Sequence, residues 1–504
     1  MSKRDGLARL GKIKTSHGIL DTPMLLPVVN PKILTLSMKE LKECGAQGII
    51  TNSYIIYKNP ELKEIAEEKG VHGLLNWDGP IMTDSGTFQS HVYGEIDMQP
   101  DEILNFQKKL EVDIGTVLDV FCEPETRFED AKKELEETQR RIEESDKNKG
   151  SIFLAAPIQG GRHLDLRLKA AQMASKTNAD VFPIGGVVPL MEKNNFDTLT
   201  EVIIASKKGL DISKPVHLFG CGHPMLFALA TFLGCDLFDS SSYAKFASRD
   251  SLMFTWGTRN LDELEIIPSE FSAAPGITIH ELKSMEKKER QKIIAKHNLI
   301  ASFAEIRRVK QAIHDGLLWE LVESRLRASP ALMKVFEVIK KEIDWIGEFE
   351  PAYRYKTPIK TGKESDFRPI FSNLSNSFKS GEMTHPYFGK VPIHLSETYP
   401  FHPGLLQNDI EGWKMQDWDV DRVKTILDYQ FGKGMGDVLT DGEIELVISR
   451  KTKRLRNLLL NGEHVASLSH RRGLFILQKR GAEIVHENSK STKYRVIVNA
   501  DTAE

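Results

Sequence analysis

"GPIMTDSGTFQS", residues 79–90, contains a short apolar run that ends abruptly at the polar residues Thr83, Asp84 and Ser85. Such a run is typical of a buried strand, and similar runs recur every 20 to 35 residues between positions 20 and 240. A segment with helical periodicity follows each run, as in 101–110, 128–145 and 165–176. The eight runs are "PMLLPVV", "GIIT", "PIMT", "IGTVLD", "IFLAAPI", "DVFPIGG", "PVHLFG" and "CDLFDS".

Eight strands that alternate with helices predict parallel β/α units, and eight is the number that closes a barrel. A doubly wound open sheet would have fewer repeats and a glycine-rich first turn, which this sequence lacks. The predicted fold class is therefore α/β, a (β/α)8 TIM-like barrel followed by C-terminal α+β extension domains.

The pattern changes after Phe254. Residues 283–346 are charged and strongly helical, 352–400 are rich in Pro, Gly, Ser and Tyr, and the alternating segments "EIELVIS", "GLFILQK" and "YRVIVNA" indicate strands. We therefore predict a barrel with a helical extension in 1–350, an α/β domain in 351–435 and a basic β-rich domain in 436–493. A further β unit is expected to begin in 494–504.

The charge of the chain is unevenly distributed. Residues 450–495 hold twelve Lys and Arg but only three Glu, a net charge of +9, so the rest of the 504-residue chain carries −12 against the total of −3. A basic module on an acidic body is expected where the module follows a polyanion. A solvated basic face without a ligand is the plainer alternative.

Cysteines and apolar segments limit the class of protein. Cys44, Cys122, Cys221 and Cys235 show no C-x-x-C spacing, which argues against a disulfide framework or a local metal knuckle. No window approaches the ~20 apolar residues that cross a bilayer, and no apolar core follows the N-terminal residues. We expect a cytoplasmic protein that does not enter a membrane.

Polar residues follow most of the apolar runs, where a β/α barrel carries its active site. Each of these residues taken singly could be a helix N-cap. Together they place carboxylates, an amide and the exposed backbone groups of glycines on one face. They are Asp84, Asp119, Gln159, Gly185, Gly186, Gly220 and Asp239. This set suits a planar heterocycle that is read along its hydrogen-bonding edge, and two carboxylates suit retaining glycoside chemistry.

Five longer segments carry a resemblance to a known family: "DGPIMTDSGTFQSHVYG", "IQGGRHLDLR", "PIGGVVPLME", "HLFGCGHPM" and "GCDLFDSSSYAKFA". They resemble the tRNA-guanine transglycosylases, and specifically the archaeal type. The resemblance implies exchange of guanine-15 in the tRNA D-arm for 7-cyano-7-deazaguanine (preQ0) on the way to archaeosine. It covers nearly the whole chain.

The resemblance also implies roles for single residues. Asp239 would be the nucleophile that attacks C1′ of the ribose, and Asp84 the general acid and base, although accounts of the family have also cast this aspartate as the nucleophile. Phe88 would stack on the base. Asp119 and Gln159 would read the edge of the base, and Gly186 and Val188 would add backbone contacts. Independently of the resemblance, Ser85 would position or cap, and Cys221, on the expected rim of the site, is a weaker candidate for a thiol nucleophile because no paired His and Asn arrangement is evident.

The sequence departs from the family at its structural zinc site. Ser269, Phe271 and Ala274 stand where the family has the cysteines of a C-x-C-x-x-C knuckle, and only the histidine, His297, is kept. One imidazole without thiolates cannot make that site, so we predict no zinc there and no other cofactor.

The second departure is C-terminal. "KYRVIVNADTAE" resembles the opening strand of the family's RNA-binding PUA domain, and we expect that domain to be truncated or supplied by another chain. The leading candidates for phosphate contacts are Arg450, Lys451, Lys453 and Arg454. The resemblance implies a homodimer. Two other functions stay open: a tRNA-binding scaffold subunit with weakened turnover, and an archaeosine-synthase paralogue, for whose additional catalytic core 350–504 gives no sign.

Overall fold

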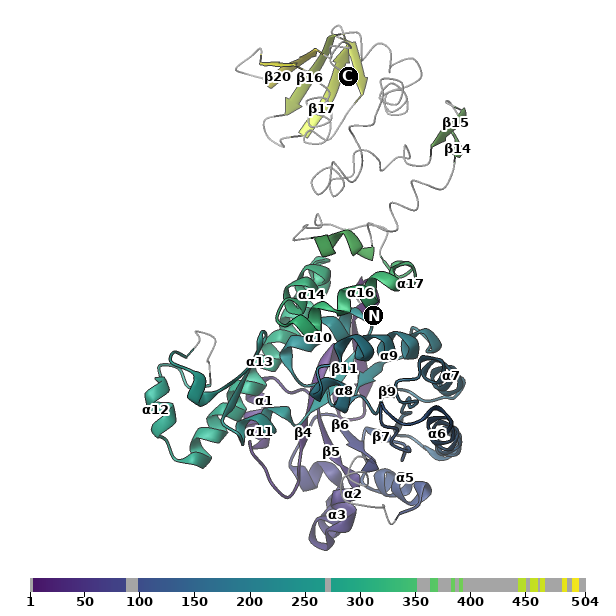
Figure 1. Cartoon of the computed structure of the whole chain (residues 1–504), viewed down its shortest axis with the longest axis vertical. Helices are drawn as coiled ribbons and strands as arrows, with labels where there is room; N and C mark the ends of the chain where they lie inside the picture. The colour runs from purple at the N-terminus through teal and green to yellow at the C-terminus, as the bar shows by residue number, and fades with distance from the viewer. Residues whose placement is uncertain are drawn as a thin grey trace. The chain divides into compact units, whose positions relative to one another are not determined.

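A computed structural model gives the fold of the chain (Figure 1). It describes residues 3–87, 98–267, 273–350 and 363–369, and the backbone of several strands between 382 and 497. The chain forms two compact units, Met1–Tyr353 with Phe367–Pro369, and Arg354–Asp366 with Ile370–Glu504. The domain boundaries expected at 435 and 493 stay predictions.

The first unit contains the predicted parallel sheet. Eight strands lie in the order β8-β7-β6-β5-β4-β11-β10-β9, and every neighbouring pair is parallel. Each of the eight apolar runs overlaps one of these strands. They are β4 Met24–Val29, β5 Ile49–Asn52, β6 Ile81–Asp84, β7 Ile114–Thr116, β8 Phe153–Ala155, β9 Phe182–Ile184, β10 Val216–Leu218 and β11 Leu237–Ser240.

Hydrogen bonds between β8 and β9 close the sheet. Ala156 N donates to Val181 O at 2.9 Å, and Ile158 N donates to Pro183 O at 2.7 Å. Parallel bridges also join Ala155 to Val181 and Ile158 to Ile184. These contacts satisfy the backbone groups that an open sheet would leave at its edges. The (β/α)8 barrel predicted from the sequence is confirmed.

Helices surround the barrel, and the segments with helical periodicity supply them (Figure 1). Among them are α5 Pro100–Lys109, α6 Phe128–Asn148, α7 Leu164–Ala174, α9 Phe196–Gly209 and α10 Pro224–Phe232. Helix α6 shows why they form: Ala131, Leu135 and Ile142 recur at helical spacing and are buried, while most of the other side chains are charged. Such a helix gains stability by burying one face against the sheet.

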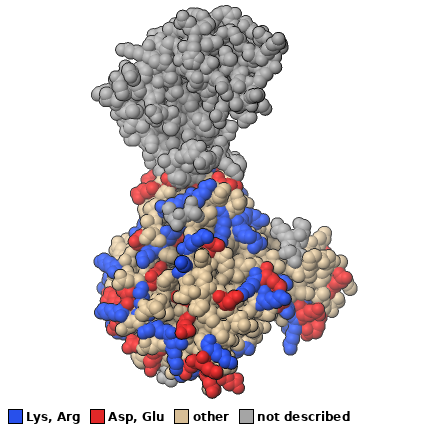
Figure 2. Space-filling view, turned by 180° about the vertical axis from the view of Figure 1, so that it is seen from behind, with Lys and Arg blue, Asp and Glu red and all other residues tan. Residues whose placement is uncertain are grey.

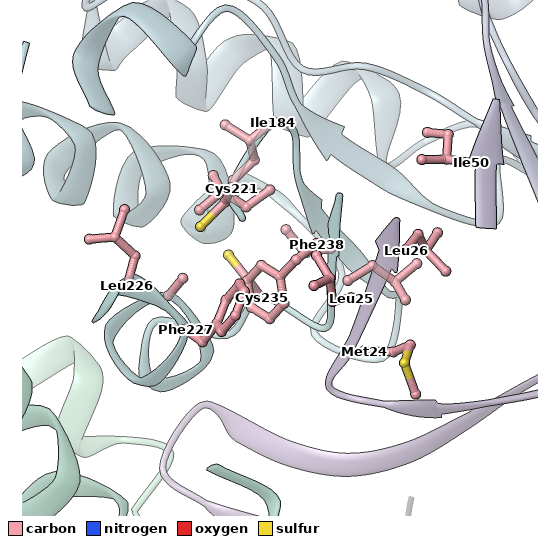
Figure 3. Packing of buried hydrophobic residues seen from close by; sticks show 14 of the residues in the cluster. Met24, Leu25, Leu26, Ile50, Ile184, Cys221, Leu226, Phe227, Cys235 and Phe238 are labelled. Atoms are coloured by element: carbon pink, nitrogen blue, oxygen red, sulfur yellow. The ribbon is translucent and has the colours of Figure 1, made fainter. Parts of the chain in front are cut away.

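The core brings strands β4, β9 and β11 together with α10 (Figure 3). Phe227 of α10 packs against Phe238 of β11 with ring centroids 5.1 Å apart. Both side chains are fully buried, and burial of one such ring contributes about 1.5–3 kcal/mol. This packing holds the carboxyl end of β11, where Asp239 lies.

A small antiparallel sheet covers the amino-terminal end of the barrel. It comprises β1 Lys3–Asp5, β2 Ala8–Thr15 and β3 Gly18–Thr22. Arg9 donates to both carboxylate oxygens of Asp236, just before β11, and Asp21 N donates to Gln47 Oε1, just before β5. The opposite, carboxyl end of the barrel is therefore left for the predicted site.

A helical extension follows the barrel, as predicted for 283–346. Helix α13 Lys287–Asp315 ends at Gly316, whose φ of 71° is the left-handed conformation that glycine adopts readily. Shorter helices follow it: α14 Leu318–Leu326, α15 Pro330–Met333, α16 Val335–Lys341 and α17 Ile343–Gly347. Arg368 donates to Glu320 of α14 at 2.5 Å, which ties residues 367–369 to this unit. No helix among the described residues is long and apolar enough to cross a membrane.

The second unit contains an antiparallel hairpin and a five-stranded sheet. The hairpin joins β14 Glu382–His385 to β15 Gly389–Pro392, and the sheet has the order β18-β17-β16-β20-β19. Its strands are β16 Glu443–Ser449, β17 Arg454–Leu460, β18 Glu463–Ala466, β19 Glu483–His486 and β20 Thr492–Ile497. "EIELVIS" is β16 and "YRVIVNA" overlaps β20, whereas "GLFILQK" lies outside the described residues. The boundary expected between 493 and 494 falls inside β20, which pairs with β16 and β19.

Candidate active site

The carboxyl ends of the strands position the predicted side chains. Asp84 is the last residue of β6, and Asp239 is the third residue of β11. Asp119 and Gln159 follow β7 and β8, Gly186 follows β9, and Val188 begins the short helix α8 Val188–Glu192. In a parallel barrel all these positions meet at one mouth, which is where the sequence predicted the site.

Asp84 is held by its neighbours. Asn52 ends strand β5 at the same register, and its Nδ2 donates to Asp84 Oδ1 at 2.6 Å. Gly86 N donates to the same oxygen at 2.8 Å, and Ser53 Oγ donates to the Asp84 carbonyl at 2.7 Å. The carboxylate is therefore fixed in position by two donors, one at the end of β5 and one in the turn after β6.

The electrostatic environment of Asp84 favours its protonated form. Burial, together with the negative charges of Asp239 and Asp119, raises the pKa of Asp84 to about 7 against the opposing hydrogen bond from Gly86. The three carboxylates are thus close enough to interact, although the strand ends that carry them are far apart in sequence. A carboxyl group with this pKa exchanges protons near neutral pH, as a general acid and base must.

Asp119 and Gln159 form a buried pair. Gln159 Nε2 donates to Asp119 Oδ2 at 2.5 Å. Gln159 is 1% exposed and Asp119 is 7% exposed. Burial raises the pKa of Asp119, and the bond from Gln159 opposes that rise. Gln159 Oε1 is buried without a hydrogen-bond partner among the described residues. A buried acceptor of this kind is available to a ligand that carries a donor.

Two glycines allow the backbone to approach Gln159. Gly186 has φ 68°, and a Cβ there would lie 2.3 Å from Cys122 O and 3.0 Å from Gln159 Oε1. A Cβ on Gly185 would lie 2.5 Å from Gln159 Nε2. Only glycine fits at these two positions of the β9 loop, residues 185–187 after strand β9, because the Gln159 amide and Cys122 O lie so close. This explains the two glycines of the "PIGG" segment.

Asp239 is anchored through one oxygen. Gly220 N donates to Asp239 Oδ1 at 2.9 Å, and His217 Nε2 lies 2.9 Å from the same atom but outside hydrogen-bond geometry. The other oxygen, Oδ2, takes part in neither contact. A Cβ on Gly220 would lie 2.3 Å from Val188 Cγ2, so Val188 packs beside the loop that holds Asp239.

A buried arginine connects the loops of the site. Arg167 of α7 is fully buried, and its Nη1 donates to Ile158 O at 2.7 Å and to Gly185 O at 2.9 Å. Its Nε donates to Gly161 O at 2.8 Å. Burial lowers the pKa of Arg167 to about 10, so the side chain stays cationic at neutral pH. It thereby fixes the segments on both sides of Gln159.

Asn52, His217 and Arg167 were not predicted from the sequence. Asn52 follows the run "GIIT" directly, so the rule that selected Asp84 would have found it. His217 lies inside the run "PVHLFG", where a polar residue in a fully buried strand was the available signal. Nothing in the segment "DLRLK" indicates that Arg167 points inward. A charged side chain in an amphipathic helix is expected on the exposed face, as Lys169 of the same helix is.

Four of the predicted residues lie outside the described part of the chain. They are Phe88, Arg450, Lys451 and Lys453, whereas Arg454 begins β17.

The structure places the two weaker candidates, Ser85 and Cys221. Ser85 is buried, and its Oγ lies 3.0 Å from Thr87 Oγ1. Cys221 is fully buried, as Figure 3 shows, and burial raises the pKa of its thiol well above the ordinary value. A thiolate nucleophile at Cys221 is therefore unfavourable.

The residues at the family's zinc position do not fit a thiolate-rich site. His297 is 1% exposed, and its Nε2 lies 3.2 Å from Met253 O. Because a carbonyl oxygen only accepts, Nε2 carries the proton and donates this hydrogen bond. Burial lowers the pKa of His297 to about 4. Ala274 packs against the hydrophobic core, while Ser269 and Phe271 lie outside the described residues.

Two family models match the chain. The model described as queuine tRNA-ribosyltransferase matches residues 4–331, which include the whole barrel. The model described as patch-forming domain C2 of tRNA-guanine transglycosylase matches residues 421–491. The first match alone covers more than half of the chain.

Curated relatives agree with these matches. A tRNA-guanine(15) transglycosylase of Thermococcus onnurineus is 41% identical over 99% of this chain and 87% of its own length. Proteins of the same name from Pyrococcus furiosus and Methanocaldococcus jannaschii are 40% and 38% identical, over 99% of this chain and 86% and 89% of their own lengths. The barrel mouth with Asp84 and Asp239 therefore lies in a chain that belongs to the tRNA-guanine transglycosylases, a family of pentosyltransferases.

Proposed function

We propose that the chain exchanges guanine-15 in the D-arm of tRNA for preQ0, through a covalent intermediate on Asp239. The observation that carries this proposal is that one barrel mouth holds two carboxyl groups, Asp84 and Asp239, in different surroundings. Burial and neighbouring charges raise the pKa of Asp84 to about 7, while Gly220 N holds Asp239 in place through Oδ1. The name of the relatives supports the position of the exchanged base, and the family resemblance supports preQ0.

In the first half of the reaction an oxygen of Asp239 attacks C1′ of the ribose. The bond between C1′ and N9 of guanine breaks, an ester bond between C1′ and Asp239 forms, and protonated Asp84 gives its proton to the leaving base. In the second half Asp84 takes a proton from preQ0, whose nitrogen attacks C1′. The ester breaks, and both carboxyl groups return to their starting states.

The base would be read by Asp119, Gln159 and the β9 loop. Guanine and preQ0 share an edge with ring N–H and amino donors beside a carbonyl acceptor, so one set of partners serves both halves of the reaction. Ionised Asp119 can only accept hydrogen bonds, whereas the Gln159 amide offers both a donor and an acceptor. Gly186 and Val188 add backbone contacts, and Phe88 stacks on the ring.

The tRNA would be held mainly by the basic C-terminal segment. Basic and acidic side chains are interspersed on the face of the first unit in Figure 2, which offers no continuous basic surface there. Residues 450–495 carry a net charge of +9. We propose that Arg450, Lys451, Lys453 and Arg454 contact phosphates, so that neutralising them weakens tRNA binding and reduces its dependence on salt.

Incorporation of labelled preQ0 or guanine into tRNA tests the proposal. The wild-type protein is expected to incorporate the label and to form a tRNA adduct that survives denaturation. Asp239→Ala should lose both, whereas Asp211→Ala, an exposed aspartate outside the site, should keep both. Incorporation that survives Asp239→Ala would refute the nucleophile, and no incorporation by wild type, even with a candidate PUA-domain protein added, would favour a scaffold role. Light scattering of the same sample tests the expected homodimer.

A further inference from the structure

A cluster of two histidines and an aspartate lies at the amino-terminal end of the barrel, opposite the catalytic mouth. His17 is in the turn between β2 and β3, His72 is in helix α3 Pro60–Leu75, and Asp113 directly precedes β7. Their ligand atoms all lie within 4.8 Å of one another. In the described part of the chain no other group of three His, Cys, Asp or Glu side chains meets this condition.

The tautomer of His72 is set by its hydrogen bond. His72 Nδ1 lies 3.0 Å from Trp77 O, and because a carbonyl oxygen only accepts, Nδ1 carries the proton. In the neutral ring Nε2 therefore holds a lone pair. This atom is buried without a hydrogen-bond partner among the described residues, and it lies 3.3 Å from Asp113 Oδ2. Two lone pairs face each other there, which is unfavourable unless a cation lies between them.

Asp113 is held as an oriented anion. Its Oδ2 accepts from Ile81 N at 2.9 Å, and its Oδ1 accepts from His17 N at 3.1 Å. The hydrogen bonds and histidine contacts lower the pKa of Asp113 despite the opposing effect of its burial. His17 Nδ1 lies 3.0 Å from Oδ1, and the His17 and His72 rings stack with centroids 3.7 Å apart. The three side chains thus gather their ligand atoms within 4.8 Å of one another.

We propose that His17 Nδ1, His72 Nε2 and the Asp113 carboxylate bind one divalent metal ion of the Zn²⁺ class. Two imidazoles and a carboxylate are ligands that Zn²⁺ takes at about 2.0–2.2 Å, which places tetrahedral ligand atoms roughly 3.4 Å apart. The observed separations of 3.0 and 3.3 Å from the carboxylate oxygens are close to that value. The bond from His72 to a carbonyl and those from backbone N–H groups to Asp113 are the outer-shell contacts that orient metal ligands.

The position of the cluster indicates a structural role. It joins the small β1–β3 sheet, helix α3 and the beginnings of β6 and β7, none of which carries one of the proposed catalytic side chains at that end. The Asp113 side chain is fully buried, that of His72 is 15% exposed and that of His17 is 36% exposed, so an ion can enter from the His17 side. Binding is expected to stabilise the barrel without changing the chemistry at Asp84.

Titration of the chelator-stripped, full-length protein with Zn²⁺ tests the site. We expect one Zn²⁺ per chain by calorimetry, and a rise of several degrees in Tm with excess Zn²⁺. His72→Gln and His17→Asn should each weaken the affinity at least about tenfold and remove the Zn²⁺-dependent rise in Tm. Co²⁺ should give ligand-field bands in the visible range without a thiolate charge-transfer band, because no cysteine takes part.

The control is a histidine–aspartate pair that, among the described residues, belongs to no group of three possible metal ligands. His314 Nδ1 lies 3.2 Å from Asp315 Oδ1 on an exposed helix end, and His314→Gln should bind Zn²⁺ as the wild type does. No Zn²⁺-dependent change in the wild type would overturn the proposal and leave an ion pair of Asp113 with protonated histidines. Equal affinity for Zn²⁺ in His17→Asn and the wild type would also overturn the proposal. Because His17 is half-exposed in a turn, this variant is expected to fold, and it tests the site even if His72→Gln does not fold.

Discussion

Asn52 and Asp84 end adjacent parallel strands at the same register, and Asn52 Nδ2 donates a hydrogen bond of 2.6 Å to Asp84 Oδ1. Asn52 also caps helix α2 Ser53–Lys58, because its Oδ1 accepts from Ile55 N at 2.8 Å. One side chain therefore couples the start of a helix to the position of the proposed acid.

Asn52→Ala is expected to raise the pKa of Asp84, because a donor to the carboxylate favours its ionised form. The alkaline limb of the pH–rate profile should move to higher pH, and kcat should fall by about 10-fold or more as the carboxyl group loses its orientation. Asn59→Ala is the matched control, since Asn59 caps α3 through Leu62 N without a contact to Asp84. A profile that is shifted equally in both variants would show that only helix capping matters.

The rate of the wild-type protein should depend on the protonation of Asp84. Because the protonated carboxyl group donates to the leaving guanine, kcat/KM for tRNA should be level below pH 7 and fall about tenfold per pH unit above it. Measurement between pH 6 and pH 9 at constant ionic strength checks this limb. A profile that is flat through pH 8 would contradict the assigned acid.

Asp84→Asn should abolish exchange and make the protein more stable in alkaline solution. The folded-state pKa of about 7 exceeds the unfolded value of ~3.9, so the wild type loses stability as pH rises from about 4 to 7, by at most about 4 kcal/mol. Asparagine has no such dependence and keeps an oxygen for the Asn52 and Gly86 donors. The difference in unfolding free energy between the two proteins should therefore be larger at pH 8 than at pH 5, as urea denaturation would show.

Gly186→Ala should weaken base binding and destabilise the fold by roughly 1–3 kcal/mol, since its Cβ would lie 2.3 Å from Cys122 O. Gly276→Ala separates this collision from backbone strain. Gly276 has φ 83°, similar to φ 68° at Gly186, but a Cβ there meets nothing within 4 Å. We expect KM for preQ0 to rise in the first variant only, and equal values of KM in both would contradict the close approach to Gln159.

Arg167→Lys keeps the charge but cannot reproduce the three hydrogen bonds to the carbonyls of Ile158, Gly161 and Gly185. Tm should fall, and KM for preQ0 should rise more than kcat falls because Arg167 positions the loops that read the base. Lys169→Arg on the exposed side of the same helix is the control. Loss of kcat with unchanged KM would contradict this positioning role.

The barrel could be predicted because its signals are local. Every apolar run reports the burial of one strand on both faces, and runs such as "PIMT" and "CDLF" end within two residues of the strand ends. The same rule located Asp84, Asp119, Gln159 and Asp239, because the carboxyl ends of parallel strands converge. The motifs also identified the family that the comparisons show.

Contacts between distant residues depended on the tertiary structure. Asn52 reaches Asp84 because β5 and β6 pair in one register, and His217 lies beside Asp239 because β10 and β11 are neighbours. The raised pKa of Asp84 requires burial and two carboxylates from other strands, and the cluster of His17, His72 and Asp113 requires three elements to meet. The sequence by itself determined which side chains stand at the strand ends, whereas barrel closure, register and burial decided which of them interact and with what strength.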